Sequence, residues 1–390
     1  MKIVFVGGSN NNNFAIVRYL RARGVEAHLR LFKSDPPHFH PACDTFSTGF
    51  MDYTETLDWS RNWVLAQSSR RQIYADLAQF DTVVGCGWLP AFAAAAGRPI
   101  DILVPHGSDI AQSSAYRFSA KNIGENIMIR YQRKGLRDVR VVHMSPTIPA
   151  YEQRIRTFMP AAERWLEGLP LIYHSEYDFA GGDQPSSRMP THWSDVFNAA
   201  RSSSDFLAVA HSRHYWSAPT SDPNHKGNDK YLRGWAQFLA RNPKLMAKLV
   251  TCEYGPDVKQ SKRLIADLGI SDSIIWLPQL FRKDIMYGLH LCDAVIGEFT
   301  HSWSTGGVIL ESAVSAKPLI THRSDERLHG GRYFSVLNAY TPEQITTQLE
   351  RCVEQKDECN AIGREAREWY QYCLVQPAIE KYLRFFGAEH

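Results

Sequence analysis

The sequence lacks the features that mark several classes of protein. Its seven cysteines are odd in number and scattered, and no two of them form a C-x-x-C pair, so neither a disulfide framework nor a zinc site is indicated. No run of 18 apolar residues is present, and the apolar run at the N-terminus is too short for a signal peptide. We therefore expect a soluble protein of the reducing cytoplasm.

The sequence also has no large excess of positive or negative charge. The formal net charge is only +3, and the chain has neither an arginine-rich tail nor an aromatic RNA-binding signature, so nucleic acid is not expected as a partner. Basic residues gather in the window 117–140, where Glu125 and Asp138 are the acids. This window either contacts the anionic inner face of a membrane peripherally, beside a lipid-linked acceptor, or is a solvated helix face.

The chain is long for a single core, because 390 residues correspond to two domains of about 150–200 residues each. Short apolar strands alternate with helical stretches in both halves, a pattern typical of parallel α/β sheets. The expected strands are 3–6, 25–31, 82–85, 101–105, 139–143, 206–210, 249–251, 274–277, 294–296 and 318–320. With a predicted linker at 177–201, the pattern indicates two Rossmann-like domains at 1–195 and 196–370.

What the second half does contain is a mononucleotide-binding pattern between Cys292 and Ile320. An apolar strand leads to a turn ending in Gly306-Gly307, then to a helix that carries Glu311, then to another strand. Glycines let backbone N–H groups approach a phosphate, and the helix N-terminus adds partial positive charge. The Glu311 carboxylate, about one turn into the helix, can accept hydrogen bonds from a ribose diol.

This segment resembles the nucleotide-sugar signature of the retaining family-4 glycosyltransferases. The matching positions are Gly306, Glu311, Ser312 and Lys317-Pro318. The resemblance implies a GT-B fold, with two Rossmann-like domains facing an interdomain cleft and a terminal helix (371–390) that crosses back to the first domain. One departure concerns the second glutamate of the family pattern, whose place is taken by Trp303.

The start of the second domain resembles another element of the same family, a strand followed by Gly-Arg and then Lys-Gly-x-Asp. Arg213 and Lys226 stand at the two cationic places. They are expected to stabilise the charge that grows on the departing diphosphate, Arg as a bidentate donor and Lys as a point charge. The alternative is two solvated surface cations. No D-x-D-like pair marks a metal site, so we expect transfer without a metal or other cofactor.

The resemblance also assigns the donor site. Gln279 and Leu280 are candidates for the nucleobase, whereas Trp276 and Leu277 are expected in the core. Glu298 lies upstream of the departure at Trp303, which either stacks on the donor sugar or fills the interior. Backbone amides of the turn are expected to hold phosphate; they belong to Ser304, Thr305, Gly306 and Gly307.

In the first domain, a Val-Pro-His-Gly-Ser-Asp string follows a strand and resembles the family's His-Gly-x-Asp segment. His106 is expected to contact the transferred sugar and Asp109 to orient it or the acceptor. The alternative is that His106 caps a turn. The loop after the first strand offers Gly8, Ser9 and Asn10 to the acceptor side, or forms a plain tight turn.

Together these features predict an enzyme that moves a sugar from a nucleoside-diphosphate sugar to an acceptor hydroxyl with retention. His106, Arg213, Lys226 and Glu311 are the residues expected to carry catalysis. The acceptor is a glycan, a lipid-linked molecule or a protein, as in bacterial-type polysaccharide or glycoconjugate synthesis. The alternatives are a phosphorylase or nucleotide-sugar epimerase of the same fold, or a catalytically silent module that binds a glycan or a partner enzyme.

Overall fold

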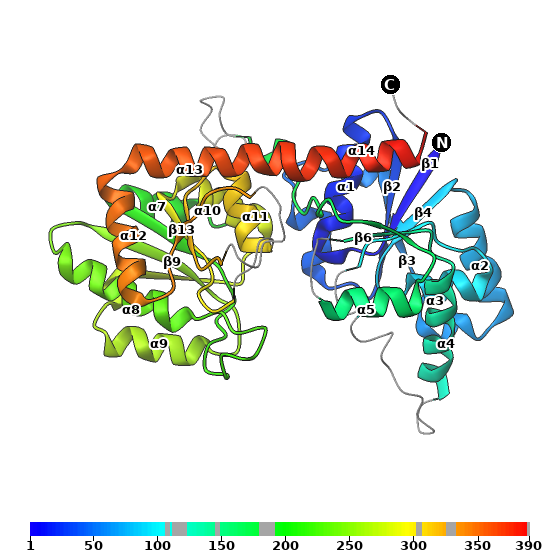
Figure 1. Ribbon diagram of the computed structural model, residues 1–390, viewed down its shortest axis with the longest axis horizontal. Helices are drawn as coiled ribbons and strands as arrows, with labels where there is room; N and C mark the ends of the chain where they lie inside the picture. The colour runs from blue at the N-terminus through cyan, green and yellow to red at the C-terminus, as the bar shows by residue number, and fades with distance from the viewer. Residues whose placement is uncertain are drawn as a thin grey trace. The chain divides into compact units, whose positions relative to one another are not determined.

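A computed structural model describes residues 1–105, 110, 123–144, 149–178, 192–301, 306–324 and 333–387. The chain forms two compact units. Unit 1 comprises Met1–Tyr173 together with Leu374–His390, and unit 2 comprises His174–Cys373. Figure 1 shows unit 1 in blue through cyan to green with its C-terminal helix in red, and unit 2 in green through yellow to orange.

Unit 1 is built on a parallel sheet of seven strands in the order β3-β2-β1-β4-β5-β6-β7. Residues 3–6 of the first strand are wholly buried, as expected for parallel strands covered on both faces. The order reverses between β1 and β4, and ligands of open α/β sheets bind at such switch points. The strands are β1 Lys2–Val6, β2 Glu26–Phe32, β3 Thr54–Leu57, β4 Thr82–Gly85, β5 Ile102–Leu103, β6 Val141–His143 and β7 Glu163–Trp165.

Helices lie on both sides of this sheet, with α1 on one side and α2 and α3 on the other (Figure 1). Gln132 fixes the start of α3, because its side chain accepts from the Ala91 amide at 3.0 Å and donates to the Gly87 carbonyl at 2.9 Å. The α-helices are α1 Asn12–Ala22, α2 Gln67–Ala78, α3 Leu89–Ala96, α4 Ile123–Arg137, α5 Pro149–Phe158 and α14 Gln376–Phe385.

The terminal helix α14 is part of the core of unit 1. The Tyr382 hydroxyl is 2.9 Å from His143 Nδ1, and its ring lies 5.8 Å from that of Phe5 and 5.3 Å from that of Trp165. Burial lowers the pKa of His143 to about 4, against the opposing effect of its hydrogen bond to the Gly168 carbonyl. His143 is therefore a neutral core residue that joins α14 to the sheet.

Unit 2 contains a parallel sheet of six strands in the order β10-β9-β8-β11-β12-β13, with the switch point between β8 and β11. Its core is aromatic, since Tyr231, Trp235 and Phe238 of one helix are fully buried. The strands are β8 Phe206–Ala210, β9 Ala247–Glu253, β10 Ile274–Pro278, β11 Ala294–Ile296, β12 Leu319–Thr321 and β13 Leu337–Asn338. The helices are α7 Ser194–Ser202, α8 Asn228–Arg241, α9 Val258–Asp267, α10 Arg282–Leu291, α11 Gly307–Val314, α12 Pro342–Glu354 and α13 Lys356–Trp369.

The expected α/β architecture is confirmed, and three details differ. The predicted linker was wrong for residues 194–201, which belong to α7. Strands β3, β7 and β13 were not expected, because they are short and each contains only one large apolar residue. The expected terminal helix is interrupted by a π-helical segment, Tyr370–Val375, within which the two units meet along the chain.

Candidate functional site

The candidate site lies at the carboxyl edge of the unit 2 sheet, on both sides of its switch point. Residues 211–213 follow β8, and residues 297–301 follow β11. Two helices begin at this edge, α8 after Gly227 and α11 after Gly306. Parallel strands that end together bring the predicted residues of separate segments to one edge.

Glu311 is held in a buried triad with His211 and Arg282. Its Oε2 is 2.8 Å from His211 Nε2, and its Oε1 accepts from Arg282 Nε at 3.1 Å. The three side chains are each less than a tenth exposed. Burial alone would raise the pKa of Glu311, but the hydrogen bond and charge of His211 and the charge and hydrogen bond of Arg282 outweigh it and lower this pKa to about 2. The carboxylate is therefore charged at neutral pH.

This triad contains two residues that the sequence analysis missed. His211 stands in the strand-end string next to Arg213, and Arg282 opens α10 directly after the predicted nucleobase segment. His211 Nδ1 is buried and has no hydrogen-bond partner in the described part of the chain. Each oxygen of Glu311 accepts one hydrogen bond and retains a further lone pair, so the carboxylate can also accept a hydrogen bond from a ligand.

Lys226 and Glu298 form a second ion pair at the same edge. Their Nζ and Oε2 atoms are 2.8 Å apart, and the side chains are 18% and 16% exposed. The sequence analysis proposed these residues separately, one for the diphosphate and one for the donor. The structure places them in direct contact, so Lys226 is a partly desolvated cation held by a carboxylate rather than a solvated surface charge.

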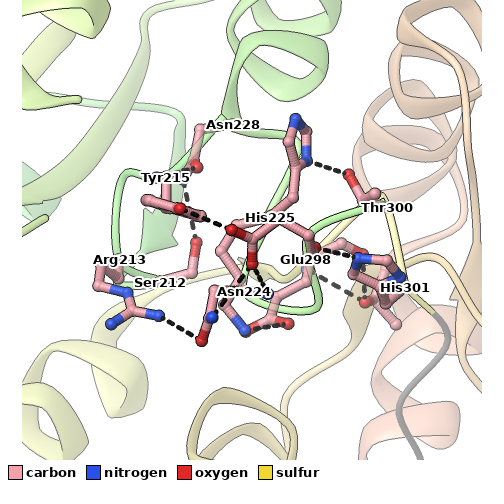
Figure 2. A network of polar contacts seen from close by, with 12 residues as sticks. Ser212, Arg213, Tyr215, Asn224, His225, Asn228, Glu298, Thr300 and His301 are labelled. Atoms are coloured by element: carbon pink, nitrogen blue, oxygen red, sulfur yellow. Dashed lines mark hydrogen bonds and ion pairs between the residues drawn. The ribbon is translucent and has the colours of Figure 1, made fainter. Parts of the chain in front are cut away.

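Arg213 lies at the start of an insertion, residues 213–225, between β8 and α8 (Figure 2). Its Nη2 donates to Asn224 Oδ1 at 3.2 Å, and its guanidinium lies 5.6 Å from the centre of the Tyr215 ring. The Tyr215 hydroxyl donates to Asp222 at 2.8 Å. The insertion thus supports Arg213 with its own side chains.

The insertion is tied to the segment that follows β11. Figure 2 shows His225 against Thr300, where Nδ1 and Oγ1 are 2.7 Å apart, and His301 Nε2 lies 2.7 Å from the Asp222 carbonyl oxygen. Gly227 makes this contact possible: its φ is +71°, and a Cβ there would be 2.8 Å from Thr300 Oγ1. The segments bearing Lys226 and Glu298 are therefore held as one polar network.

The far side of the insertion is anchored by Asp257 and His214. The Asp257 carboxylate accepts from the amides of Trp216 and Ser217 at 2.6 and 2.8 Å. His214 contacts the hydroxyl of Ser261 at 2.8 Å, and burial lowers its pKa to about 4. Both groups are fully engaged in structure, so neither is a candidate for chemistry.

The remaining donor-site predictions fall on residues of different accessibility. Gln279 is exposed after β10, whereas Leu280 is buried, as is Leu277. Gly306 is the N-cap of α11, and a Cβ there would have no atom of the described residues within 4 Å, other than its chain neighbours. A Cβ on Gly307 would lie 3.7 Å from Glu311 Oε2. The other predicted residues of this turn lie outside the described residues: Trp303, Ser304 and Thr305.

In unit 1 the predicted residues belong to the loop after β1. The Gly8 amide donates to Asp35 Oδ2 at 3.0 Å, and Ser9–Asn11 form a 3₁₀ turn in which Asn10 has a φ of +54°. Asp35 was not predicted. Its Oδ2 also accepts from the Phe32 amide at 3.0 Å, so this carboxylate joins the loop after β1 to the end of β2. His106 and Asp109 lie outside the described residues.

The basic window 117–140 is described only from residue 123 onward. It includes α4, on which Arg130, Lys134 and Arg137 are exposed. Arg140 is 3.3 Å from Asp101, so part of this charge is already paired. No helix in the described part of the chain has the length and apolar character needed to cross a bilayer. Within that same part, no three His, Cys, Asp or Glu side chains are grouped so as to hold a metal ion.

Solved structures with this architecture match the whole chain. The Anabaena protein Alr3699/HepE in complex with UDP is 18% identical, with a TM-score of 0.63 and all of both chains covered. A glycosyltransferase from Rickettsia africae is 12% identical, with a TM-score of 0.61 over 99% of this chain and 97% of its own. The fold is GT-B.

A different activity occurs on the same fold. The UDP-GlcNAc 2-epimerase of Neisseria meningitidis, bound to UDP-GlcNAc, is 11% identical with a TM-score of 0.56, covering 98% of this chain and all of its own. No family model and no curated protein matches the sequence. At such identities the likeness establishes the fold, and the activity has to be argued from the site.

Proposed function

We propose that this protein is a glycosyltransferase that transfers a sugar from a UDP-sugar to an acceptor hydroxyl with retention, in the manner of family 4. The observation that carries the proposal is the charged Glu311, buried about one turn into α11, the helix that follows Gly306-Gly307. A nucleoside diphosphate has a diol for the carboxylate and phosphates for the helix N-terminus. UDP is chosen because Alr3699/HepE was solved with UDP and with UDP-glucose.

Lys226 and Arg213 are the proposed catalytic cations. When the bond between the sugar and the diphosphate breaks, negative charge grows on the leaving oxygens, and fixed cations there lower the barrier. Lys226 exchanges its contact with Glu298 for the diphosphate, which frees the Glu298 carboxylate for the donor sugar. Glu298 then supplies the group that the family pattern has at the position of Trp303. With two cations and a helix N-terminus available, we propose transfer without a metal.

Retention requires departure and attack on the same face of the sugar. We assign no covalent nucleophile; His106 and Asp109 keep their proposed roles toward the sugar and the acceptor. We further propose that the acceptor belongs to polysaccharide or glycoconjugate synthesis and that the protein works in the cytoplasm, where exposed cations of α4 contact an anionic membrane surface peripherally.

The test is a thermal-shift and turnover screen with UDP-, GDP-, dTDP- and CMP-sugars. A UDP-sugar that raises the melting temperature and is slowly hydrolysed to UDP supports the transferase. Conversion of the bound sugar to its epimer without release of UDP would establish the epimerase instead. Stabilisation with neither product, even when candidate acceptors are present, would identify a binding module. Activity that needs inorganic phosphate would indicate a phosphorylase.

A further inference from the structure

Unit 1 has a pocket of its own at the carboxyl edge of its sheet, above the ends of β1 to β4. Its volume of about 640 Å³ is within the range of small-molecule sites. The pocket spans the switch point between β1 and β4, where open α/β sheets place ligands. None of the charged groups of the unit 2 site belongs to it.

Aromatic side chains form the apolar part of this pocket. Phe32, Trp59 and Phe92 pack on one another with ring centres 5.6–6.0 Å apart, and Phe39 and Trp88 line it as well. Trp59 Nε1 donates to Asp76 Oδ2 at 2.8 Å. That bond fixes the indole and uses its only donor, so Trp59 offers the pocket an apolar ring surface.

The pocket does not have the lining that an alkyl chain would favour. Among the described residues that line it, no side chain is Leu, Ile, Val or Met. The walls are flat rings, and the rest are glycine, cysteine and polar residues. Flat aromatic faces pack best against another flat ring, whereas a flexible chain gains most from aliphatic surroundings.

The charges of the pocket do not favour an anion. Asp35 and Asp58 stand against Lys33 alone, and Lys33 Nζ is 3.7 Å from Asp58 Oδ1. A diphosphate or a lipid phosphate would therefore meet net negative charge. Neutral hydroxyl groups meet suitable partners, because the rim carries the hydroxyls of Ser34 and Ser60 and the exposed carboxylate of Asp58.

We propose that this pocket binds a neutral pyranose ring of the acceptor, with one C–H face of the sugar on the aromatic wall and its hydroxyls at the rim. A pyranose combines a flat apolar face with a polar edge, which is the combination that the lining presents. The binding itself is a property of unit 1; that the bound sugar is the acceptor rests on the proposed function.

The test uses the full-length protein and a panel of methyl glycosides of neutral hexoses and their disaccharides, titrated by calorimetry. Octyl phosphate and uridine are titrated as probes for an alkyl chain and a nucleobase. We expect at least one glycoside to saturate the protein and neither other probe to compete with it. Trp88→Ala should weaken that glycoside about tenfold or more, and Trp88→Phe should weaken it less because a ring is kept.

Two further variants control for folding. Ser60→Trp adds a ring at an exposed rim position, leaves the core unchanged and should block the glycoside. Tyr74→Ala removes a half-exposed ring from α2 outside the pocket and should have no effect. No glycoside binding, binding that Trp88→Ala and Ser60→Trp leave unchanged, or displacement by octyl phosphate or uridine overturns the proposal.

The UDP-induced thermal shift separates this result from the proposed function, since it reports on unit 2. Glycoside binding without any response to UDP-sugars would mean that the pocket binds a sugar, but not as the acceptor of a transfer reaction. A UDP response with hydrolysis, but without glycoside binding at the pocket, leaves the transferase and overturns the pocket assignment.

Discussion

The carboxyl edges of the two sheets have the same backbone arrangement but carry different side chains. In each unit the first strand leads to a loop and a helix whose N-cap is left-handed, Asn11 before α1 and Gly227 before α8. At the edge of unit 2 charged pairs dominate, with Glu311 and Glu298 each in an ion pair. At the edge of unit 1 aromatic rings dominate, and the carboxylate of Asp35 is occupied by backbone amides.

This difference suits unit 2 to an anionic ligand and unit 1 to a neutral one. A cation that is already partly desolvated and held in place, as Lys226 is by Glu298, can exchange that carboxylate for a phosphate with little further desolvation. Aromatic rings without a surplus of cations do not neutralise a phosphate, but they can pack against the C–H face of a neutral sugar ring. The same fold thus presents two chemistries, because the loops at strand ends vary while the strands do not.

The largest expected effect is the loss of the Glu311 charge. Glu311→Gln leaves Arg282 buried without its counter-ion, and breaking a buried pair from one side costs about 3–5 kcal/mol of folding free energy. UDP affinity should also fall, by about 1–3 kcal/mol for a charged hydrogen bond. Native-state hydrogen exchange of unit 2 and calorimetric titration with UDP measure the two effects.

The matched control is Glu253→Gln, which removes an exposed ion pair with Lys262 in the same unit and should change stability by at most about 1 kcal/mol. If Glu311→Gln proved as stable as this control, the buried charge of unit 2 would not be what distinguishes the two edges. Unchanged UDP affinity in a stable Glu311→Gln protein would remove Glu311 from the nucleotide site.

The second effect is on turnover. Lys226→Ala should lower kcat by about a hundredfold to a thousandfold, the scale for one preorganised group that stabilises transition-state charge, and should change KM much less. Arg213→Ala should act in the same direction. Lys262→Ala, which removes a half-exposed lysine of the same unit, should leave kcat unchanged. Equal losses in kcat and in substrate affinity would mean that Lys226 binds the ground state only.

The arrangement of the sheets could be predicted from the sequence because buried parallel strands are short, continuous apolar runs. Strands 206–210, 294–296 and 82–85 were placed at their observed bounds for this reason. The two edge strands of the unit 1 sheet were not predicted: β3 reads Thr-Glu-Thr-Leu and β7 reads Glu-Arg-Trp, and only the last residue of each is buried. Their pairing partners, not their own composition, define them.

The site was predictable where a motif stood in one segment and not where residues met across segments. Gly306 and Glu311 stand five residues apart, at the N-cap and within α11, so one local pattern named both, and their roles stay predictions. His211 and Arg282 reach Glu311 from two other strand ends, and their distance along the chain of 100 and 29 residues leaves no local signal. The contact of Lys226 with Glu298 could likewise not be predicted from the sequence, because the two residues lie 72 positions apart, although each was proposed separately for the donor site.

A third prediction concerns a property that the two units share. His143 in unit 1 and His214 in unit 2 have pKa values of about 4, against 6.5 for an ordinary histidine. Between these values the unfolded chain binds more protons, so stability is fully present above pH 6.5 and falls as the pH drops toward 4. The loss is about 3 kcal/mol for each histidine.

Hydrogen exchange at pH 7.5 and pH 5, corrected for intrinsic rates, should show about 2 kcal/mol of this loss per histidine in both units, because pH 5 is still above the folded-state pKa. His143→Gln should reduce the pH dependence in unit 1 alone. His214→Gln should reduce it in unit 2 alone, where part remains because burial also lowers the pKa of His290 to about 4. A pH dependence confined to one unit would contradict the shared role of buried neutral histidines.

The smallest effect tests the two left-handed N-caps against each other. Gly227→Asn puts a Cβ 2.8 Å from Thr300 Oγ1, so it should destabilise unit 2 by about 1–2 kcal/mol. Asn11→Gly relaxes the backbone but removes the Nδ2 donation to the His38 carbonyl, so its net change should stay within about 1 kcal/mol. In a Thr300→Ala background the cost of Gly227→Asn should shrink, because the clashing oxygen is gone. A double-mutant cycle on melting temperature measures that coupling. If the cost were the same in both backgrounds, backbone conformation alone, and not the close approach of the segment after β11, would explain why glycine stands at 227.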